Sequence, residues 1–129
     1  MFEGKTVAVI VPCYNEENQI GRVLETIPDF VDCIIVVDDA STDGTVDAVN
    51  RYIQQHDNAS RIVLLRQDRN RGQGAAVERA AREVISRRFD IAAVMDGDGQ
   101  MDPKQLRLIV APVARGKADY AKALSLIHI

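Results

Sequence analysis

Two aspartates separated by one residue, Asp96 and Asp98, are the side chains of this sequence best suited to chemistry. Residues two apart in an extended segment point the same way, so the two carboxylates can converge on one cation. Gln100 continues the spacing and adds a neutral oxygen, while Gly97 and Gly99 let a ligand approach the backbone closely. We predict a site for Mg²⁺ or Mn²⁺ here, completed by a phosphate-bearing ligand.

The sequence on either side of these aspartates predicts a strand before them and a helix after them. Residues 91–95 (IAAVM) are continuously apolar, as in a buried strand. Asp102 is a good N-cap residue, and Pro103 suits the first position of a helix. The metal-binding loop is therefore expected at the carboxyl end of a strand.

The rest of the chain repeats this alternation of strand and helix patterns. Continuous apolar runs predict buried strands at residues 6–11, 32–37, 62–65 and 91–95. Apolar residues at helical spacing predict helices at residues 20–27, 46–53, 77–85 and 106–113. Asn15 is the expected N-cap of the first helix. Strands that are apolar on both faces indicate an α/β fold, with a Rossmann-like parallel sheet and helices on both faces.

Three polar loops are expected at one edge of this sheet. They follow the first, second and fourth strands, at residues 12–16, 38–44 and 96–100. Open parallel sheets bind ligands outside the carboxyl ends of the strands, where the strand order reverses. With the order 3-2-1-4, the first and fourth strands are neighbours, and their loops face each other across one crevice. Asp39, on a rigid strand end, suits a ribose hydroxyl or a base N–H, both of which are donors.

Carboxylates gathered in one crevice keep their charge only when it is compensated. Two close carboxylates repel by roughly 4 kcal/mol at an effective dielectric constant of 20. A cation that bridges Asp96 or Asp98 to a diphosphate would neutralise this charge and stabilise a departing nucleoside diphosphate. The predicted chemistry is therefore Lewis-acid support of a phosphate leaving group.

Length and composition indicate one globular domain. The chain has 129 residues, of which 47% are hydrophobic and 27% charged, so it can bury a core. A net charge of -3 argues against a nucleic-acid partner, which requires a basic face. Cys13 and Cys33 are expected as buried thiols in a reducing compartment. No apolar run approaches a membrane span and no signal peptide precedes Lys5, so we expect a soluble, cytoplasmic chain.

Three stretches taken together resemble family 2 glycosyltransferases of the GT-A fold. They are residues 9–17 (VIVPCYNEE), 36–45 (VVDDASTDGT) and 96–100 (DGDGQ). The likeness is greatest to the dolichyl-phosphate mannose synthase type, which residues 70–76 (NRGQGAA) also resemble. The resemblance covers nearly all of residues 5–122, with the motifs in the family's order and spacing.

The resemblance implies how a nucleotide-sugar donor is bound. The residues expected to meet the donor are Pro12, Tyr14, Glu16, Val37, Asp39, Asp96, Gly97 and Asp98. The residues expected to hold the metal are Asp96, Asp98 and Gln100. Such enzymes move a sugar from GDP or UDP to an acceptor such as a polyprenyl phosphate, and they generally invert the anomeric centre.

The family's acceptor-binding half, including any catalytic base, has no counterpart in this sequence. Residues 1–123 are therefore expected to form the nucleotide-sugar-binding part of an incomplete GT-A domain, with little or no transfer activity of their own. The complete protein is expected at the cytoplasmic face of a membrane, with the missing C-terminal part making the contact.

The last six residues, 124–129 (LSLIHI), are the translation of CTGTCTCTTATACACATC, a transposase end sequence used to prepare DNA libraries. We expect a non-native tail produced by read-through into an adapter. The alternative is an ordinary apolar strand.

Three other interpretations of the chain remain open. It could be a nucleotide-sugar-binding module without catalysis. Phosphatases of the haloacid dehalogenase type also use an Asp-x-Asp-Gly motif, but there the motif follows the first strand and its first aspartate is a nucleophile. A calcium-binding EF-hand loop could begin at Asp96, although Met101 stands where such a loop needs glycine and Pro103 interrupts it.

Overall fold

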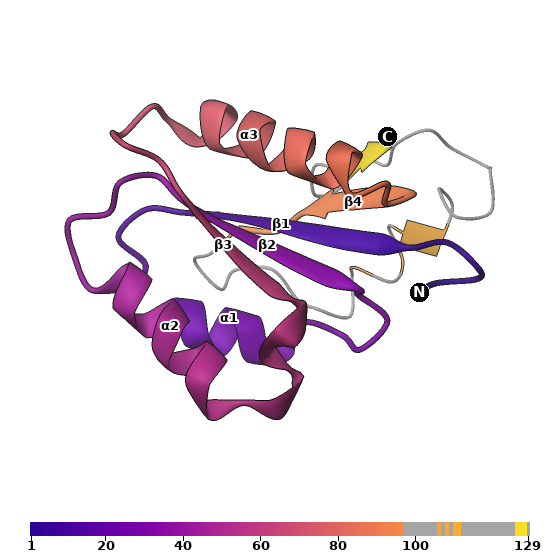
Figure 1. Ribbon diagram of the computed structural model, residues 1–129, viewed down its shortest axis with the longest axis horizontal. Coiled ribbons are helices and arrows are strands. Elements are labelled where there is room, and N and C mark those ends of the chain that lie inside the picture. The colour runs from indigo at the N-terminus through magenta and orange to yellow at the C-terminus, as the bar shows by residue number, and fades with distance from the viewer. Residues whose placement is uncertain (97–105, 107, 109, 112–125, 129) are drawn as a thin grey trace.

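A parallel sheet forms the centre of the computed structural model, which describes residues 1–96, 106, 108, 110–111 and 126–128 (Figure 1). Its parallel strands are β1 (Val7–Cys13), β2 (Cys33–Asp38), β3 (Ile62–Arg66) and β4 (Ile91–Val94). A fifth strand, β5 (Leu126–His128), pairs antiparallel with β4. The order across the sheet is β3-β2-β1-β4-β5, which confirms the predicted order and parallel pairing of the first four strands.

Helices cover both faces of this sheet, as predicted. α1 (Ile20–Thr26) and α2 (Thr45–Gln55) lie on one face, and α3 (Gln73–Ser86) lies on the other (Figure 1). A short 3-10 helix, η1 (Asp57–Arg61), joins α2 to β3. Residues 106, 108, 110 and 111 are also helical, and Leu106 and Val110 are buried, as expected for the last predicted helix. None of the helices in the described part is long and apolar enough to cross a membrane.

Burial on both faces explains why the central strands are apolar up to their last residue, which in β2 is Asp38. Every residue of β1 and of β2 is buried. Side chains alternate between the faces, so Val9 and Val11 join the core under α1 and α2, whereas Ala8 and Ile10 join the core under α3. The strands themselves have no room for polar chemistry, which is left to the loops at their ends.

Pro12 lies inside β1, although the apolar run predicts that the strand ends at residue 11. Pro12 pairs with Val37 of β2, and β1 continues to Cys13. Alternate residues of a parallel strand bond to opposite neighbours, and the Ile10 oxygen accepts a hydrogen bond from the Met95 N–H on the β4 side. Pro12 therefore faces β4 too, at the point where the β1–β4 pairing stops, so its missing N–H leaves the pairing of β1 with β2 intact.

Asn15 and Ile85 also depart from the predictions. Asn15 does not cap α1, which begins only at Ile20 after a turn, and the side-chain oxygen of Asn15 bonds to another loop instead. Ile85 is 55% exposed, although its spacing predicts burial. It follows Val84, the last member of a narrow buried stripe on α3, and so lies about 100° further around the helix.

Candidate functional site

A pocket of about 190 Å³ opens where the parallel strands end. It is lined by Pro12, Cys13, Tyr14, Glu16, Asp39, Gln73, Ala76 and Asp96. These residues follow or end β1, β2 and β4, or belong to the first turn of α3. Segments far apart in the sequence thus converge, and five of the predicted site residues, drawn from all three predicted loops, lie around one pocket.

The pocket is acidic. Carboxylates of Glu16, Asp39 and Asp96 line it, and no basic side chain is among the described residues on its wall. Grouped carboxylates need a cation or hydrogen-bond donors to hold their charge. A ligand that fits this pocket must therefore present N–H or O–H donors, arrive with a cation, or do both.

Asp39 has a structural bond that its sequence position did not reveal. Its side chain is buried, and its two carboxylate oxygens accept hydrogen bonds from the backbone N–H groups of Arg71 and Gly72, each at 2.9 Å. Each carboxylate oxygen can accept more than one hydrogen bond. Asp39 can therefore hold the turn before α3 and still offer acceptor capacity to a ligand.

Gln73, the first residue of α3, was also absent from the predicted site. Its side-chain Nε2 donates a hydrogen bond of 3.0 Å to Oδ1 of Asp96, which is exposed beyond the end of β4. This bond joins the helix side of the pocket to the strand side. The signal that could have pointed to Gln73 is its place within residues 70–76 (NRGQGAA), a stretch that resembles the dolichyl-phosphate mannose synthase type.

Three of the predicted donor and metal residues, Gly97, Asp98 and Gln100, lie outside the described residues. Within the part of the chain that the structure describes, no group of three His, Cys, Asp or Glu side chains could hold a metal ion. Asp96 is the one predicted metal ligand that is described, and it lies on the pocket wall. The metal site therefore stays a prediction.

Hydrogen bonds join the loop after β1 to the loop after β2. The Glu16 N–H donates to Oγ1 of the buried Thr45 at 2.9 Å, and the Asp39 N–H donates to the Cys13 oxygen at 3.0 Å. Asp43 accepts bonds from both the N–H and the hydroxyl of Thr45. Desolvation raises the pKa of Asp43, but these hydrogen bonds outweigh it, so the pKa lies below its usual value. The Asp43 carboxylate is thus a charged, structural member of the second loop.

Cys13 lines the pocket, whereas its hydrogen-bond partner Val37 does not. Burial, reinforced by the carboxylates of Asp38 and Glu16, raises the pKa of the Cys13 thiol to about 12. The protonated thiol donates to the Val37 oxygen at 3.7 Å. Val37 itself does not line the pocket, because its side chain points into the core under α3. Both cysteines are free and buried, as predicted.

Comparison with known sequences identifies the family. The model of glycosyl transferase family 2 matches residues 8–126. A dodecaprenyl-phosphate galacturonate synthase from Rhizobium johnstonii is 34% identical over 119 residues, which are 88% of this chain and 34% of that protein. A UDP-N-acetylglucosamine–dolichyl-phosphate N-acetylglucosaminyltransferase from Methanococcus voltae is 27% identical over 126 residues, covering 90% of this chain and 50% of that protein.

Solved structures show the same architecture. The mannosyltransferase PcManGT from Pyrobaculum calidifontis, in complex with GDP-Man and Mn²⁺, matches with a TM-score of 0.66 and 34% identity, over 73% of this chain and 28% of that one. Glucosyl-3-phosphoglycerate synthase from Mycobacterium tuberculosis, with Mn²⁺, UDP-glucose and phosphoglyceric acid, matches with a TM-score of 0.68 and 25% identity, over 88% and 41% of the two chains.

The chain spans between a third and a half of the length of the two curated relatives. Its parallel sheet, strand order and flanking helices are those of the GT-A fold shared by the matching glycosyltransferases. Since the family model covers almost the whole of it, this chain belongs to glycosyl transferase family 2.

Proposed function

We propose that the chain is the donor-binding part of a metal-dependent glycosyltransferase. The complete enzyme moves a hexose from a GDP- or UDP-linked donor to an acceptor, which is a polyprenyl phosphate. The observation that carries this proposal is the convergence of Pro12, Tyr14, Glu16, Asp39 and Asp96 on one acidic pocket at the carboxyl edge of the sheet. That edge is where open parallel sheets bind nucleotides.

The wall of the pocket suits a nucleoside. Asp39 presents buried acceptor oxygens, and uracil, guanine and ribose all carry N–H or O–H donors. Tyr14 is 43% exposed, so its ring offers an apolar face to a planar base. The two solved relatives were crystallised with a GDP-linked and a UDP-linked sugar, which supports both candidate bases. The relatives named for dodecaprenyl phosphate and dolichyl phosphate support a lipid phosphate acceptor.

The donor set at the other side of the pocket fits a hard divalent cation. Asp96 contributes an exposed carboxylate at the pocket wall, and carboxylate oxygens are the ligands that Mg²⁺ and Mn²⁺ prefer. Both solved relatives contain Mn²⁺. We assign its binding to Asp96, Asp98 and Gln100, and the bound ion would stabilise the charge that develops on the departing diphosphate.

The proposed reaction is a direct displacement. An oxygen of the acceptor phosphate forms a bond to the anomeric carbon while the bond from that carbon to the diphosphate breaks. The electron pair leaves with the nucleoside diphosphate, and the anomeric configuration inverts. The residues of this chain bind and orient the donor, and we expect acceptor-binding residues in the part of the relatives that this chain does not span.

Residues 1–123 are, in this proposal, the donor-binding part, and residues 124–129 are a non-native tail. The pairing of β5 with β4 is compatible with a non-native tail, because the unpaired N–H and C=O groups of an edge strand can pair with a short extended peptide. Recovery of the parent gene tests it. A genomic sequence that encodes LSLIHI followed by a stop codon would reject the adapter hypothesis.

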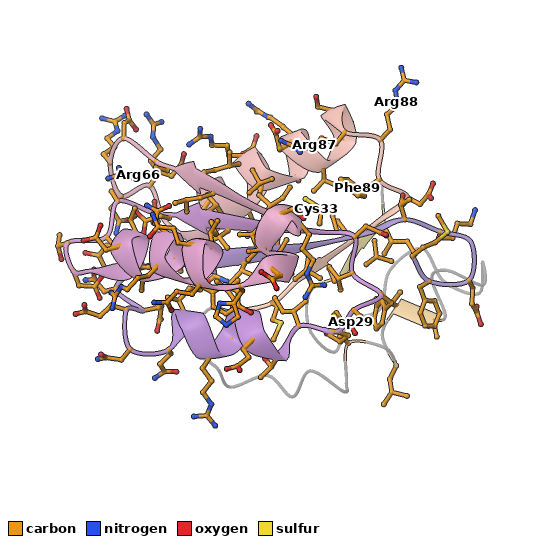
Figure 2. The ribbon with its side chains drawn as sticks, turned by 60° about the horizontal axis from the view of Figure 1, so that its bottom comes forward. Asp29, Cys33, Arg66, Arg87, Arg88 and Phe89 are labelled. Atoms are coloured by element: carbon orange, nitrogen blue, oxygen red, sulfur yellow. The ribbon has the colours of Figure 1, made fainter. Side chains whose placement is uncertain are left out.

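Calorimetric titration with UDP and with GDP, each with and without Mn²⁺, tests the donor site. We expect binding that requires Mn²⁺ and is weakened by Asp96→Ala and by Asp98→Ala. Asp29→Ala is the matched control, because Asp29 is exposed in the loop between α1 and β2, at the opposite edge of the sheet (Figure 2). Nucleotide binding that ignores the metal and both pocket substitutions would reject the proposal.

A further inference from the structure

Asn15 stands between two residues of the pocket wall without lining the pocket itself. Its neighbours Tyr14 and Glu16 both face the pocket. The Asn15 backbone has φ 54°, in the left-handed region that residues other than glycine seldom adopt. A short polar side chain that bonds locally makes this conformation tolerable. The structure shows what that side chain bonds to.

The Asn15 side-chain oxygen accepts hydrogen bonds from the loop after β2. The donors are the Thr42 backbone N–H at 2.8 Å, the Asp43 backbone N–H at 3.3 Å and the Thr42 hydroxyl at 3.4 Å. Two successive backbone amides thus point at one oxygen. A side chain without an acceptor at this place would leave both amides without this partner.

The backbone of Asn15 bonds to the same loop. Its N–H donates to Oγ of Ser41 at 2.9 Å, and the Ser41 hydroxyl in turn donates to the carboxylate of Asp38. Asp38 is buried at the end of β2, and the Ser41 N–H also donates to it at 3.2 Å. Asn15 is therefore connected, through Ser41, to the buried carboxyl end of β2.

We propose that Asn15 is a positioning residue of the donor site. Its bonds to residues 41–43 hold Tyr14 and Glu16 opposite Asp39, so that the nucleoside side of the pocket exists before the donor arrives. This inference rests on the proposed function. When the pocket wall is ordered before binding, nucleotide binding does not include the entropic cost of ordering that wall. Removal of these hydrogen bonds should therefore weaken nucleotide binding.

Three substitutions separate the backbone conformation of Asn15 from its hydrogen bonds. Asn15→Gly keeps the left-handed backbone but removes the acceptor oxygen. Asn15→Asp keeps both, because aspartate accepts hydrogen bonds and tolerates this backbone conformation. Asn18→Gly is the matched control, the same change at an exposed position in the turn before α1 and outside the pocket wall.

We would measure the dissociation constant of each variant for UDP or GDP in the presence of Mn²⁺, using the nucleotide that the wild-type chain binds. Pyrophosphate with Mn²⁺ is the reference ligand. Loss of the two stronger hydrogen bonds should raise the nucleotide constant about tenfold in Asn15→Gly. Asn15→Asp and Asn18→Gly should stay within about threefold of wild type. Pyrophosphate binding should not change, because the diphosphate is assigned to the Asp96 side of the pocket.

Each outcome supports or overturns the positioning role. Equal losses for nucleotide and pyrophosphate in Asn15→Gly would mean a general structural role and overturn it. Unchanged nucleotide binding in Asn15→Gly, or no recovery in Asn15→Asp, would also overturn it while leaving the proposed function intact. If the wild-type chain binds neither nucleotide with Mn²⁺, the proposed function fails and this inference fails with it.

Discussion

The Asp39 carboxylate accepts a hydrogen bond of 2.9 Å from the backbone N–H of Gly72, and so ties the end of β2 to the residue that precedes α3. A second bond of the same length comes from the Arg71 N–H. The residue that we assign to donor recognition therefore also fixes the loop on the other side of the pocket. The Asp39 side chain therefore links the binding of a ligand in the pocket to the order of the loop before α3.

Asp39→Asn should destabilise the fold as well as weaken nucleotide binding. The amide group keeps one acceptor oxygen but turns an N–H₂ toward a backbone N–H, so one of the two charge-assisted hydrogen bonds is lost. We expect a loss of about 1–3 kcal/mol in the free energy of unfolding, measured by chemical denaturation. Asp29→Asn, an exposed change at the far edge of the sheet, should have no comparable effect. Equal stability of Asp39→Asn and wild type would show that the two bonds do not contribute.

Gly72→Ala should destabilise the protein although there is space for the methyl group. An added Cβ at Gly72 would meet no atom within 4 Å, but the backbone has φ 91° and ψ 161°, a conformation that is almost restricted to glycine. We expect a cost of about 1–3 kcal/mol in the free energy of unfolding. Gly21→Ala is the contrasting control, since Gly21 lies in α1 with equal space and without a positive φ.

Alanine stabilises a helix more than glycine does, so Gly21→Ala should leave the free energy of unfolding unchanged or increase it by up to about 1 kcal/mol. A loss at Gly21 that matches the loss at Gly72 would show that the added methyl group, and not the left-handed backbone of Gly72, is responsible.

The Cys13 thiol should resist modification in the folded protein. Its pKa of about 12, raised first by burial and then by nearby carboxylates, leaves on the order of one molecule in ten thousand as thiolate at pH 8. Labelling with a thiol-specific disulfide reagent, in a Cys33→Ala background, should be slow in buffer and fast in guanidinium chloride. Rapid labelling of the folded chain would contradict the burial of this thiol.

The same thiol gives the stability a dependence on alkaline pH. The pKa is raised on folding from 9.0 to about 12, so the folded state holds the proton more tightly than the unfolded state. The stabilisation is complete below pH 9 and is lost as the pH rises toward 12. Cys13→Ala should flatten this part of the stability profile. A profile of the same steepness in both proteins would assign the loss to other groups.

The strands of the sheet could be predicted because their residues meet a single structural requirement, which is burial in the core. Strands such as β2 are buried on both faces, and a short, continuous, β-branched apolar run such as residues 33–37 is typical of a strand in that position. The convergence of Tyr14, Asp39 and Asp96 followed from the rule that carboxyl ends of parallel strands meet at one edge. Both inferences use only the pattern along the chain.

The hydrogen-bond partners could not be predicted in the same way. Asn15 is a strong N-cap residue, and the choice between capping α1 and bonding to Thr42 depends on where the loop after β2 lies. Asp39 gave no sign that it holds the turn at Gly72, because that turn is more than thirty positions away in sequence. Whether a polar side chain bonds to a ligand or to a neighbouring loop depends on the folded arrangement of segments that are distant in sequence.

The central place of β1 has a consequence for the newborn polypeptide. β1 leaves the ribosome before the other strands of this sheet, yet in the finished sheet it lies between β2 and β4. One edge of this apolar strand stays open until residues 91–94 have been synthesised, which makes the nascent chain prone to aggregate. Asp96 follows β4 directly, so the acidic pocket is completed only when that edge closes. A ligand that requires both sides of the pocket would therefore bind only chains in which β4 has been synthesised and has paired with β1.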